Sequence, residues 1–256
     1  VKIPSTLQCS QFILLGWFVN TVTWFRLGDA YRAYEFSRES RSNLPGVIGT
    51  VVAERVLDMV TVFILMITAS LYLSIDHDLI PSPSLLIAST VMVISLILLL
   101  LLMNQFGMKL SRWLPQKLQG IYTLFHTGTL GSFKSLPLVI LLGLIGWGLE
   151  IGRLFFVIEA LGLDVRLSLI LFVALASSLL STIPVTPGGL GVVEPGIIGI
   201  LMLSLDRPDS VSIALMDRSI SYGSIVLLGG ILFAFVQIKR SVLARKSLNI
   251  IKGTDP

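Results

Sequence analysis

The feature that most constrains this chain is a set of residues that returns 163 positions later without a gap, as from Gly28 to Gly191. The repeated residues comprise a glycine turn, a proline and an acid-arginine pair, all close to or within long apolar segments. They are Val22-Thr23, Leu27-Gly28, Pro45 and Glu54-Arg55 in the first copy, and Val185-Thr186, Leu190-Gly191, Pro208 and Asp217-Arg218 in the second. This recurrence indicates two copies of one structural unit, and internal duplication in a membrane protein is typical of transporters.

The composition places the chain in a bilayer. Hydrophobic residues make up 54% of it, charged residues only 13%, and the mean hydropathy is +0.89, whereas soluble domains carry roughly 25% charged residues. Membrane-length apolar runs are long, continuous and rich in Leu and Ile, which favours helices over the short alternating strands of a barrel. We therefore predict an all-α, polytopic transmembrane bundle, with spans at 47–75, 84–103, 136–161 and 211–236 and shorter apolar pieces at 5–22, 168–183 and 189–203.

The whole chain, 1–256, is expected to form a single transmembrane domain with repeat halves at about 5–103 and 168–240. The chain begins at Val1 and leads at once into an apolar segment, so we expect one or two helices of the intact protein to precede it. Its one cysteine, Cys9, excludes an intramolecular disulfide and is interpreted as a packing residue.

Loop charges predict the topology. Lys and Arg dominate 104–135 and the tail after 237, which places both in the cytoplasm under the positive-inside rule. The loop at 75–84 has no Lys or Arg, and the loops at 162–167 and 204–210 have one Arg each, so these belong outside. The expected location is a prokaryotic plasma membrane with the basic C-terminus cytoplasmic.

This topology requires the pieces 168–183 and 189–203 to make no net crossing, because they begin and end outside. They are predicted to form a re-entrant hairpin that turns at Pro184–Gly191. If 5–22 and the helix after Gly28 form the matching hairpin from the cytoplasmic side, three crossings separate the copies and the repeats are inverted. Irregular backbone at membrane depth must be buried in protein or line a wet cavity, and inverted repeats with broken helices surround the substrate site in many transporters.

At these positions the chain resembles the flippase-like membrane proteins that include the transmembrane flippase region of bacterial lysylphosphatidylglycerol synthases. The residues that carry the resemblance are Gly28-Asp29, Arg32-Ala33, Glu54-Arg55 with Asp58, Pro184–Gly191 with Glu194, and Arg218 with Tyr222. Where the family has a Pro-Gly-Gly-rich turn before Gly28-Asp29, this chain has Trp24–Leu27, without the glycines that favour a tight first hairpin. The resemblance implies movement of an anionic or aminoacylated phospholipid, or of a polyprenyl-phosphate-linked lipid, between leaflets.

Ionisable residues inside the apolar segments give a compatible picture, because such groups are costly in lipid and usually mark function. Glu150 and Arg153 are one turn apart and can pair on one helix face, as can Arg55 and Asp58. We hypothesise that Arg55, Arg153 and Arg218 receive a lipid phosphate, since the guanidinium fork matches phosphate bidentately. Helix N-termini after Gly28 and Gly191 could direct N–H groups at the same anion.

Structural interpretations stand beside the functional ones. Glu54-Arg55 and Asp217-Arg218 could extend to the membrane surface, Glu150-Arg153 could be an ion pair that only holds two helices together, and the glycines could only serve close helix packing. The segment that contains Arg32, Glu35 and Arg38 has the pattern of a solvated or interfacial helix.

The candidate substrate-binding set gathers these residues: Asp29, Glu54, Arg55, Asp58, Glu150, Arg153, Pro187, Gly188, Gly189, Gly191, Glu194 and Arg218. We predict no catalytic residue, metal or cofactor, and no nucleic-acid partner. Membrane lipids are the expected partners, with a lipid-modifying enzyme or a second copy as further candidates. Two other functions stay open: a membrane glycosyl- or lipid-transferase that uses Asp76-His77-Asp78, and a non-catalytic partner of a lipid-modifying enzyme.

Overall fold

The computed structural model describes residues 3–76, 90–91, 94–95, 98, 101–107, 115–182 and 186–252, and within these ranges all regular structure is helical. The predicted all-α fold is confirmed. The helices are α1 (Thr6–Val22), α2 (Leu27–Ser40), α3 (Leu44–Asp76), α5 (Gln116–Gly131), α6 (Leu136–Ala160), α7 (Leu167–Thr182), α8 (Val193–Leu201) and α9 (Arg207–Lys252), with short 3-10 turns at Ser132–Ser135 and Pro187–Gly189.

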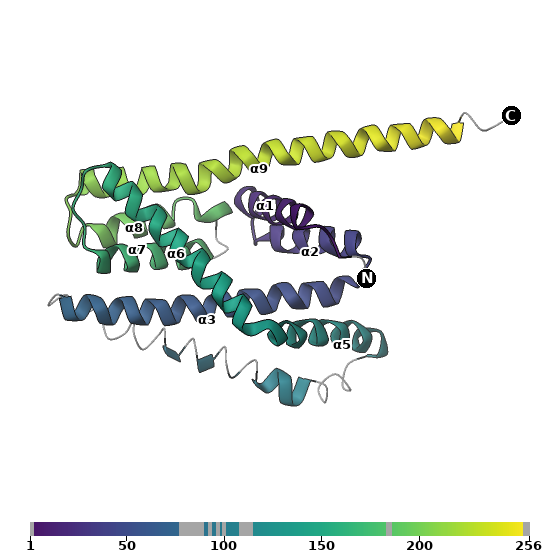
Figure 1. Ribbon diagram of the computed structural model, residues 1–256, viewed down its shortest axis with the longest axis horizontal. Helices are drawn as coiled ribbons and strands as arrows, with labels where there is room; N and C mark the ends of the chain where they lie inside the picture. The colour runs from purple at the N-terminus through teal and green to yellow at the C-terminus, as the bar shows by residue number, and fades with distance from the viewer. Residues whose placement is uncertain are drawn as a thin grey trace.

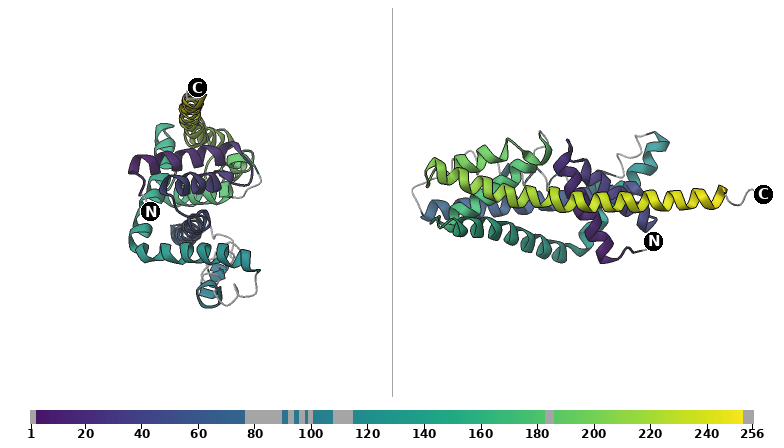
Figure 2. Two further views of the ribbon diagram at one scale, coloured as in Figure 1. Left: turned by 90° about the vertical axis from the view of Figure 1, so that its right-hand side faces the viewer. Right: turned by 90° about the horizontal axis from the view of Figure 1, so that it is seen from above.

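Two helix pairs fill the space between the long helices α3 and α9 (Figure 1). The α1–α2 pair lies towards one end of the molecule and the α7–α8 pair towards the other, with their turns facing each other. The first helix of each pair packs on the long helix of the other half, α1 on α9 and α7 on α3. The second helix packs on the long helix of its own half, α2 on α3 and α8 on α9. Figure 2 shows α9 running the length of the molecule past both pairs.

The long helices of the two copies begin in the same way. Asn43 caps α3 by accepting a hydrogen bond from the Gly46 amide at 2.8 Å, and Asp206 caps α9 by accepting one from the Asp209 amide at 3.1 Å. Asn43 and Asp206 are separated by the repeat offset, and Pro45 and Pro208 occupy the early helical positions that suit proline. The repeat is therefore matched by equal local structure at both helix starts.

The first turn is as tight as the second although it lacks glycine. Phe25 and Arg26 adopt left-handed φ angles of 59° and 53°, and their equivalents Gly188 and Gly189 have φ angles of 59° and 75°. Thr23 and Thr186, which open the two turns, are both extended. Non-glycine residues rarely hold this conformation, so the contacts of the two flanking helices impose it here.

Glycines let the helices approach closely. A Cβ atom on Gly28 of α2 would collide with the Gly16 carbonyl of α1, and one on Gly128 of α5 would collide with the Gly46 carbonyl of α3. Such contacts are typical of helix packing in membranes, where small residues allow backbones to touch.

The outer surface is apolar. In the described part of the chain, two helical stretches are long and apolar enough to cross a membrane, Leu136–Ala160 and Arg207–Ser241, and only 6% of the apolar window of each is buried within the protein. Their large side chains, such as Leu149, Phe156 and Phe235, lie 65% or more exposed. A soluble fold would hide these surfaces, whereas a lipid environment accommodates them.

The observed helices match the predicted segments closely. α3 begins three residues before the predicted 47, and α9 extends past 211–236 at both ends, because polar residues continue a helix that hydropathy alone does not detect. The predicted span 84–103 lies mostly outside the described residues, as do Pro184, Val185, His77 and Asp78. Asp76 is the last residue of α3.

The segment around Arg32, expected to be a solvated or interfacial helix, is only partly exposed. Arg32 binds Glu54 of α3 through both terminal nitrogens, at 3.1 and 2.9 Å. Glu35 is only 3% exposed and accepts a 2.5 Å hydrogen bond from Arg240 of α9. Arg32 and Glu35 therefore contact two other helices, whereas the Arg38 side chain is 55% exposed. The helical pattern of α2 alone does not reveal these contacts.

Candidate functional site

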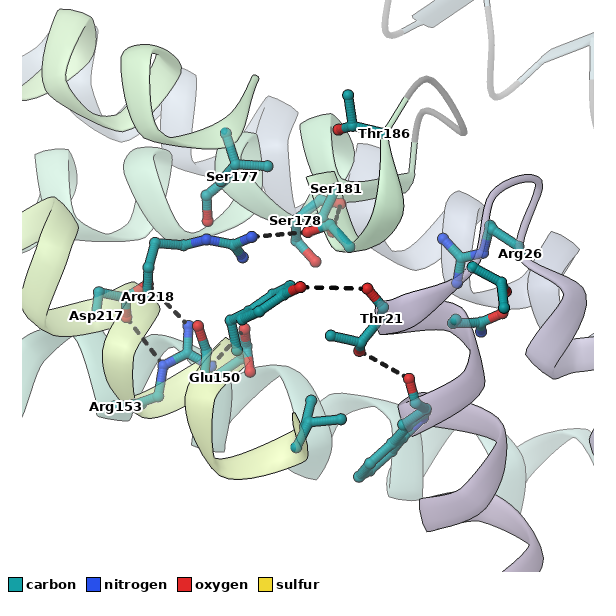
Figure 3. A pocket seen from close by; sticks show the side chains of 18 of the residues that line it. Thr21, Arg26, Glu150, Arg153, Ser177, Ser178, Ser181, Thr186, Asp217 and Arg218 are labelled. Carbon is teal, nitrogen blue, oxygen red and sulfur yellow. Dashed lines mark hydrogen bonds and ion pairs between the residues drawn. The ribbon is translucent and has the colours of Figure 1, made fainter. Parts of the chain in front are cut away.

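A polar cavity of about 300 Å³ lies where the two turns meet. Its walls come from α1, α6, α7 and α9 and from both turns (Figure 3). The polar residues that line it are Asn20, Thr21, Thr23, Arg26, Glu150, Arg153, Ser177, Ser178, Ser181, Thr186, Asp217, Arg218, Ser221 and Tyr222. Tyr222 joins the halves across it, because its hydroxyl donates to the Thr21 carbonyl at 3.4 Å and its ring lies against Gly188.

Arg153 holds two carboxylates from two helices. Its Nε and Nη2 atoms donate to the two oxygens of Asp217 on α9, at 2.9 and 3.3 Å, and its Nη1 lies 2.8 Å from Glu150 on its own helix. The predicted Glu150–Arg153 contact is present. Asp217 is 2% exposed, so it does not extend to the membrane surface, and Arg153 offsets the cost of its burial.

Arg218 ties the second turn to α9. Its Nε donates to Glu194 of α8 at 2.9 Å and its Nη2 donates to the Gly188 carbonyl at 2.7 Å. The guanidinium also lies 5.4 Å from the centre of the Tyr222 ring, within cation–π range. This one side chain thereby fixes the turn, the following helix and the tyrosine that spans the cavity.

A second charged cluster lies on the first half, behind the cavity wall. Arg32 and Arg55 both bind Glu54, and Arg55 also approaches Asp58 at 3.3 Å and Asp29 at 3.9 Å. Asp29 in turn lies 3.6 Å from Arg26, which lines the cavity. The cluster thus reaches the cavity through Arg26.

The structure brings some of the predicted residues together and not others. Glu150, Arg153, Gly188 and Arg218 line the cavity. Pro187, Gly189 and Gly191 shape the second turn, and Glu194 stands behind Arg218. Asp29, Glu54, Arg55 and Asp58 do not line it, so the hypothesis that Arg55, Arg153 and Arg218 surround one anion does not describe this conformation.

Two glycine amides lie next to the helix N-termini that were expected to face an anion, and both have acceptors within the protein. The Gly28 amide donates to the side chain of Asn20 at 2.8 Å, and the Gly191 amide donates to Glu194 at 2.6 Å. In this conformation these two amides therefore bind side chains of the protein.

The sequence analysis did not select several of the residues that line the cavity. Ser177, Ser178 and Ser181 form a polar patch within the apolar helix α7, which was the available signal. Arg26 was not selected because it lies in Trp24–Leu27, the turn that departs from the family pattern. Two residues that line the cavity, Thr186 and Ser221, have side-chain oxygens that are buried without a hydrogen-bond partner.

Among the described residues, no three His, Cys, Asp or Glu side chains are grouped closely enough to hold a metal ion. The charged groups of the cavity are arginines with carboxylate partners, which suits recognition of charged groups and not metal coordination.

Comparison with known proteins supports a family assignment. Residues 3–229 match the family described as the lysylphosphatidylglycerol synthase TM region. A UPF0104 membrane protein of Methanocaldococcus jannaschii is 36% identical over 223 residues, 86% of this chain and 94% of that protein. One of Pyrococcus horikoshii is 27% identical, covering 89% of this chain and 76% of the relative. No solved structure matches. This chain is therefore a membrane protein of the lysylphosphatidylglycerol synthase TM region family.

Proposed function

We propose that this protein moves a lipid with an anionic headgroup, either a phospholipid or a polyprenyl-phosphate-linked lipid, between the leaflets of the membrane. The observation that carries the proposal is the polar cavity, which holds Arg26, Arg153 and Arg218 inside a molecule with an apolar outer surface. A charged headgroup cannot cross hydrocarbon at low cost. Such a cavity offers it a polar path while the lipid chains stay outside in the bilayer.

Phosphate recognition would proceed by exchange of partners. Each cavity arginine binds a carboxylate in the present conformation: Arg26 binds Asp29, Arg153 binds Asp217 and Arg218 binds Glu194. A phosphate can replace a carboxylate on a guanidinium fork with little change of geometry. The hydroxyls of Thr186 and Ser221 are then available as additional donors.

Movement between leaflets would use the two halves as opposite gates. We infer that the halves are inverted repeats, because their hairpins approach from opposite ends, make equivalent contacts and share the same turn conformation. Opening one pair while the other stays closed would expose the cavity to one leaflet at a time. In this proposal the basic C-terminus faces the cytoplasm of a prokaryotic plasma membrane, and the protein transports lipid without catalysing a reaction.

The test is reconstitution in liposomes that contain fluorescent phospholipids, with a membrane-impermeant quencher added from one side. The double variant Glu194→Gln/Arg218→Gln removes both charges of one cavity pair, so that no charge is left buried alone. Lipid movement should fall on the order of 10-fold or more, since a hydrogen bond to a charged group contributes about 1.5–3 kcal/mol.

Arg207→Gln is the matched control, because Arg207 lies at the exposed start of the same helix. It should move lipid like the unmodified protein. The proposal fails if the unmodified protein redistributes phospholipids and polyprenyl-phosphate lipids no faster than empty liposomes do.

A further inference from the structure

A second cavity, of about 200 Å³, lies between α1, α2 and α3, on the first half only. Most of its lining is apolar: Phe12 and Ile13 from α1, Ala33 and Phe36 from α2, and Val47 and Val51 from α3. The polar pair Arg32 and Glu54 also contributes to its wall. The cavity is therefore amphipathic, with hydrocarbon on most sides and charge at one place.

Arg32, which contributes the positive charge to the cavity wall, has one hydrogen-bond donor that is not used. Arg32 gives both terminal nitrogens to Glu54, but its Nε atom is buried and has no hydrogen-bond partner. A buried donor without an acceptor costs about 1–3 kcal/mol. An acceptor oxygen brought by a ligand would remove that cost.

The repeat identifies two lining positions at which the first half has the smaller residue. At the offset that relates Gly28 to Gly191, Cys9 corresponds to Phe172 and Thr50 corresponds to Ile213. Phe172 is 8% exposed in an apolar cluster with Met66 and Leu175, and Ile213 is 0% exposed in a different cluster. Cys9 and Thr50 are therefore the positions at which larger side chains can be tested as a filling for the cavity.

The cavity is open to the outside of the protein, because Thr50 in its lining is exposed and Cys9, Phe12 and Ile13 are only partly buried. The apolar outer surface of a membrane protein is in contact with lipid. Protein interiors are close-packed, and an apolar cavity of about 150 Å³ is already large enough to bind a benzene molecule. Lipid hydrocarbon is therefore the occupant that matches both the lining and the surroundings.

We propose that this cavity binds one hydrocarbon chain of a membrane lipid, with a polar oxygen at the head of that chain accepting a hydrogen bond from Arg32. The site is separate from the polar cavity, and its occupation does not depend on the proposed transport. Its charged part is nevertheless connected to the polar cavity through Glu54, Arg55, Asp29 and Arg26. A lipid held here would lie next to the first hairpin.

The experiment uses the protein in lipid nanodiscs and a phospholipid that carries a photoactivatable group in its acyl chain. After illumination, the labelled residues are located by mass spectrometry. The double variant Cys9→Phe/Thr50→Ile fills the cavity with the side chains that the second half has at these positions. Cys9→Ser/Thr50→Ser changes the same two residues but leaves the volume open.

We expect labelling of the cavity residues Phe12, Phe36 and Val51, a loss of at least several-fold in Cys9→Phe/Thr50→Ile, and retention in Cys9→Ser/Thr50→Ser. Labelling of the exposed faces of α6 and α9 serves as the internal reference and should be equal in all three proteins. The proposal is overturned if the cavity residues are labelled no more than these faces, or if the filled variant is labelled like the open one. Because photolabelling measures binding without transport, its result is independent of the liposome assay. The proposed function can fail while this site is upheld, and this site can fail while the proposed function is upheld.

Discussion

At the scale of single residues, the arginines inside this molecule are held in sets with carboxylates. Arg153 has Asp217 and Glu150, Arg218 has Glu194, and Arg32 has Glu54. Charges at membrane depth are tolerated when they are paired and hydrogen-bonded. Each guanidinium therefore has at least one carboxylate partner, and those of Arg153 and Arg218 stand in the wall of the polar cavity.

The buried pair of Arg153 and Asp217 should be strongly coupled. Arg153→Met leaves Asp217 buried without a partner, which we expect to cost about 3–5 kcal/mol in stability. Arg153→Met/Asp217→Leu should recover most of that loss, since neither charge is then buried alone. The apparent Tm in one detergent measures both, with Arg207→Met as the exposed control on α9. Additive effects of the two substitutions would contradict the pairing.

The two turns predict opposite effects of changes at equivalent positions. Phe25 is 76% exposed with a φ of 59°, so Phe25→Gly loses little packing and should stabilise the protein by about 1 kcal/mol by relieving the left-handed conformation. Gly188 has the same φ angle, and a Cβ there would lie 2.7 Å from the Tyr222 ring. Gly188→Ala should therefore destabilise it. Thermal unfolding of the two variants in one detergent tests the prediction, and a change of the same sign in both would refute it.

At the scale of helices, close approach at glycine determines which helices can pair. Gly46 and Gly49 on α3 face α5, where a Cβ on Gly49 would collide with the Phe125 carbonyl. The same helices bury Thr129 and His126. The α3–α5 pair is thus held by backbone contact instead of by large interdigitating side chains.

Two glycines of α5 provide a matched test of this packing. Gly128→Ala places a methyl group against the Gly46 carbonyl and should lower the apparent Tm, because the helices must separate. Gly120→Ala meets no atom within 4 Å and should raise stability by up to about 1 kcal/mol through higher helix propensity. Circular dichroism melts of both variants measure this. Equal behaviour would mean that the contact with α3 does not matter.

At the scale of the whole molecule, the two hairpins touch each other at the polar cavity and separate its two ends. Tyr222 of α9 lies between them: its hydroxyl donates to the Thr21 carbonyl of the first hairpin, and its ring contacts Gly188 in the turn of the second. A transport cycle that opens one hairpin at a time must break this contact. A covalent bridge at the same place should therefore stop the cycle.

We expect a reversible bridge between Thr21→Cys and Tyr222→Cys, made in a Cys9→Ser background with a short cleavable bifunctional thiol reagent, to halt lipid movement in liposomes. Cleavage of the bridge should restore it, because the first hairpin can then move away from α9 again. Each single-cysteine variant treated with the reagent is the control. Unchanged lipid movement in the bridged protein would show that the first hairpin need not part from α9.

Much of the fold could be predicted because its determinants are local. Hydropathy located the spans from 136 and from 168 within a residue of the observed starts of α6 and α7, and the repeat marked the two long helices. The first turn could not be predicted from Trp24–Leu27, because its left-handed residues are imposed by the packing of α1 on α2 and not by their own preference.

The sequence by itself determined that this is a helical membrane protein, with charged residues that recur 163 positions apart, as Glu54-Arg55 and Asp217-Arg218 do. Only the tertiary structure decided which charges meet. Glu150 and Arg153 were foreseeable because one helical turn separates them, whereas Asp217, which completes their set, is 64 residues from Arg153. Ion pairing depends on distance in space and not along the chain, so the partner of Arg153 and the separation of Arg55 from the cavity could be read only from the packed helices.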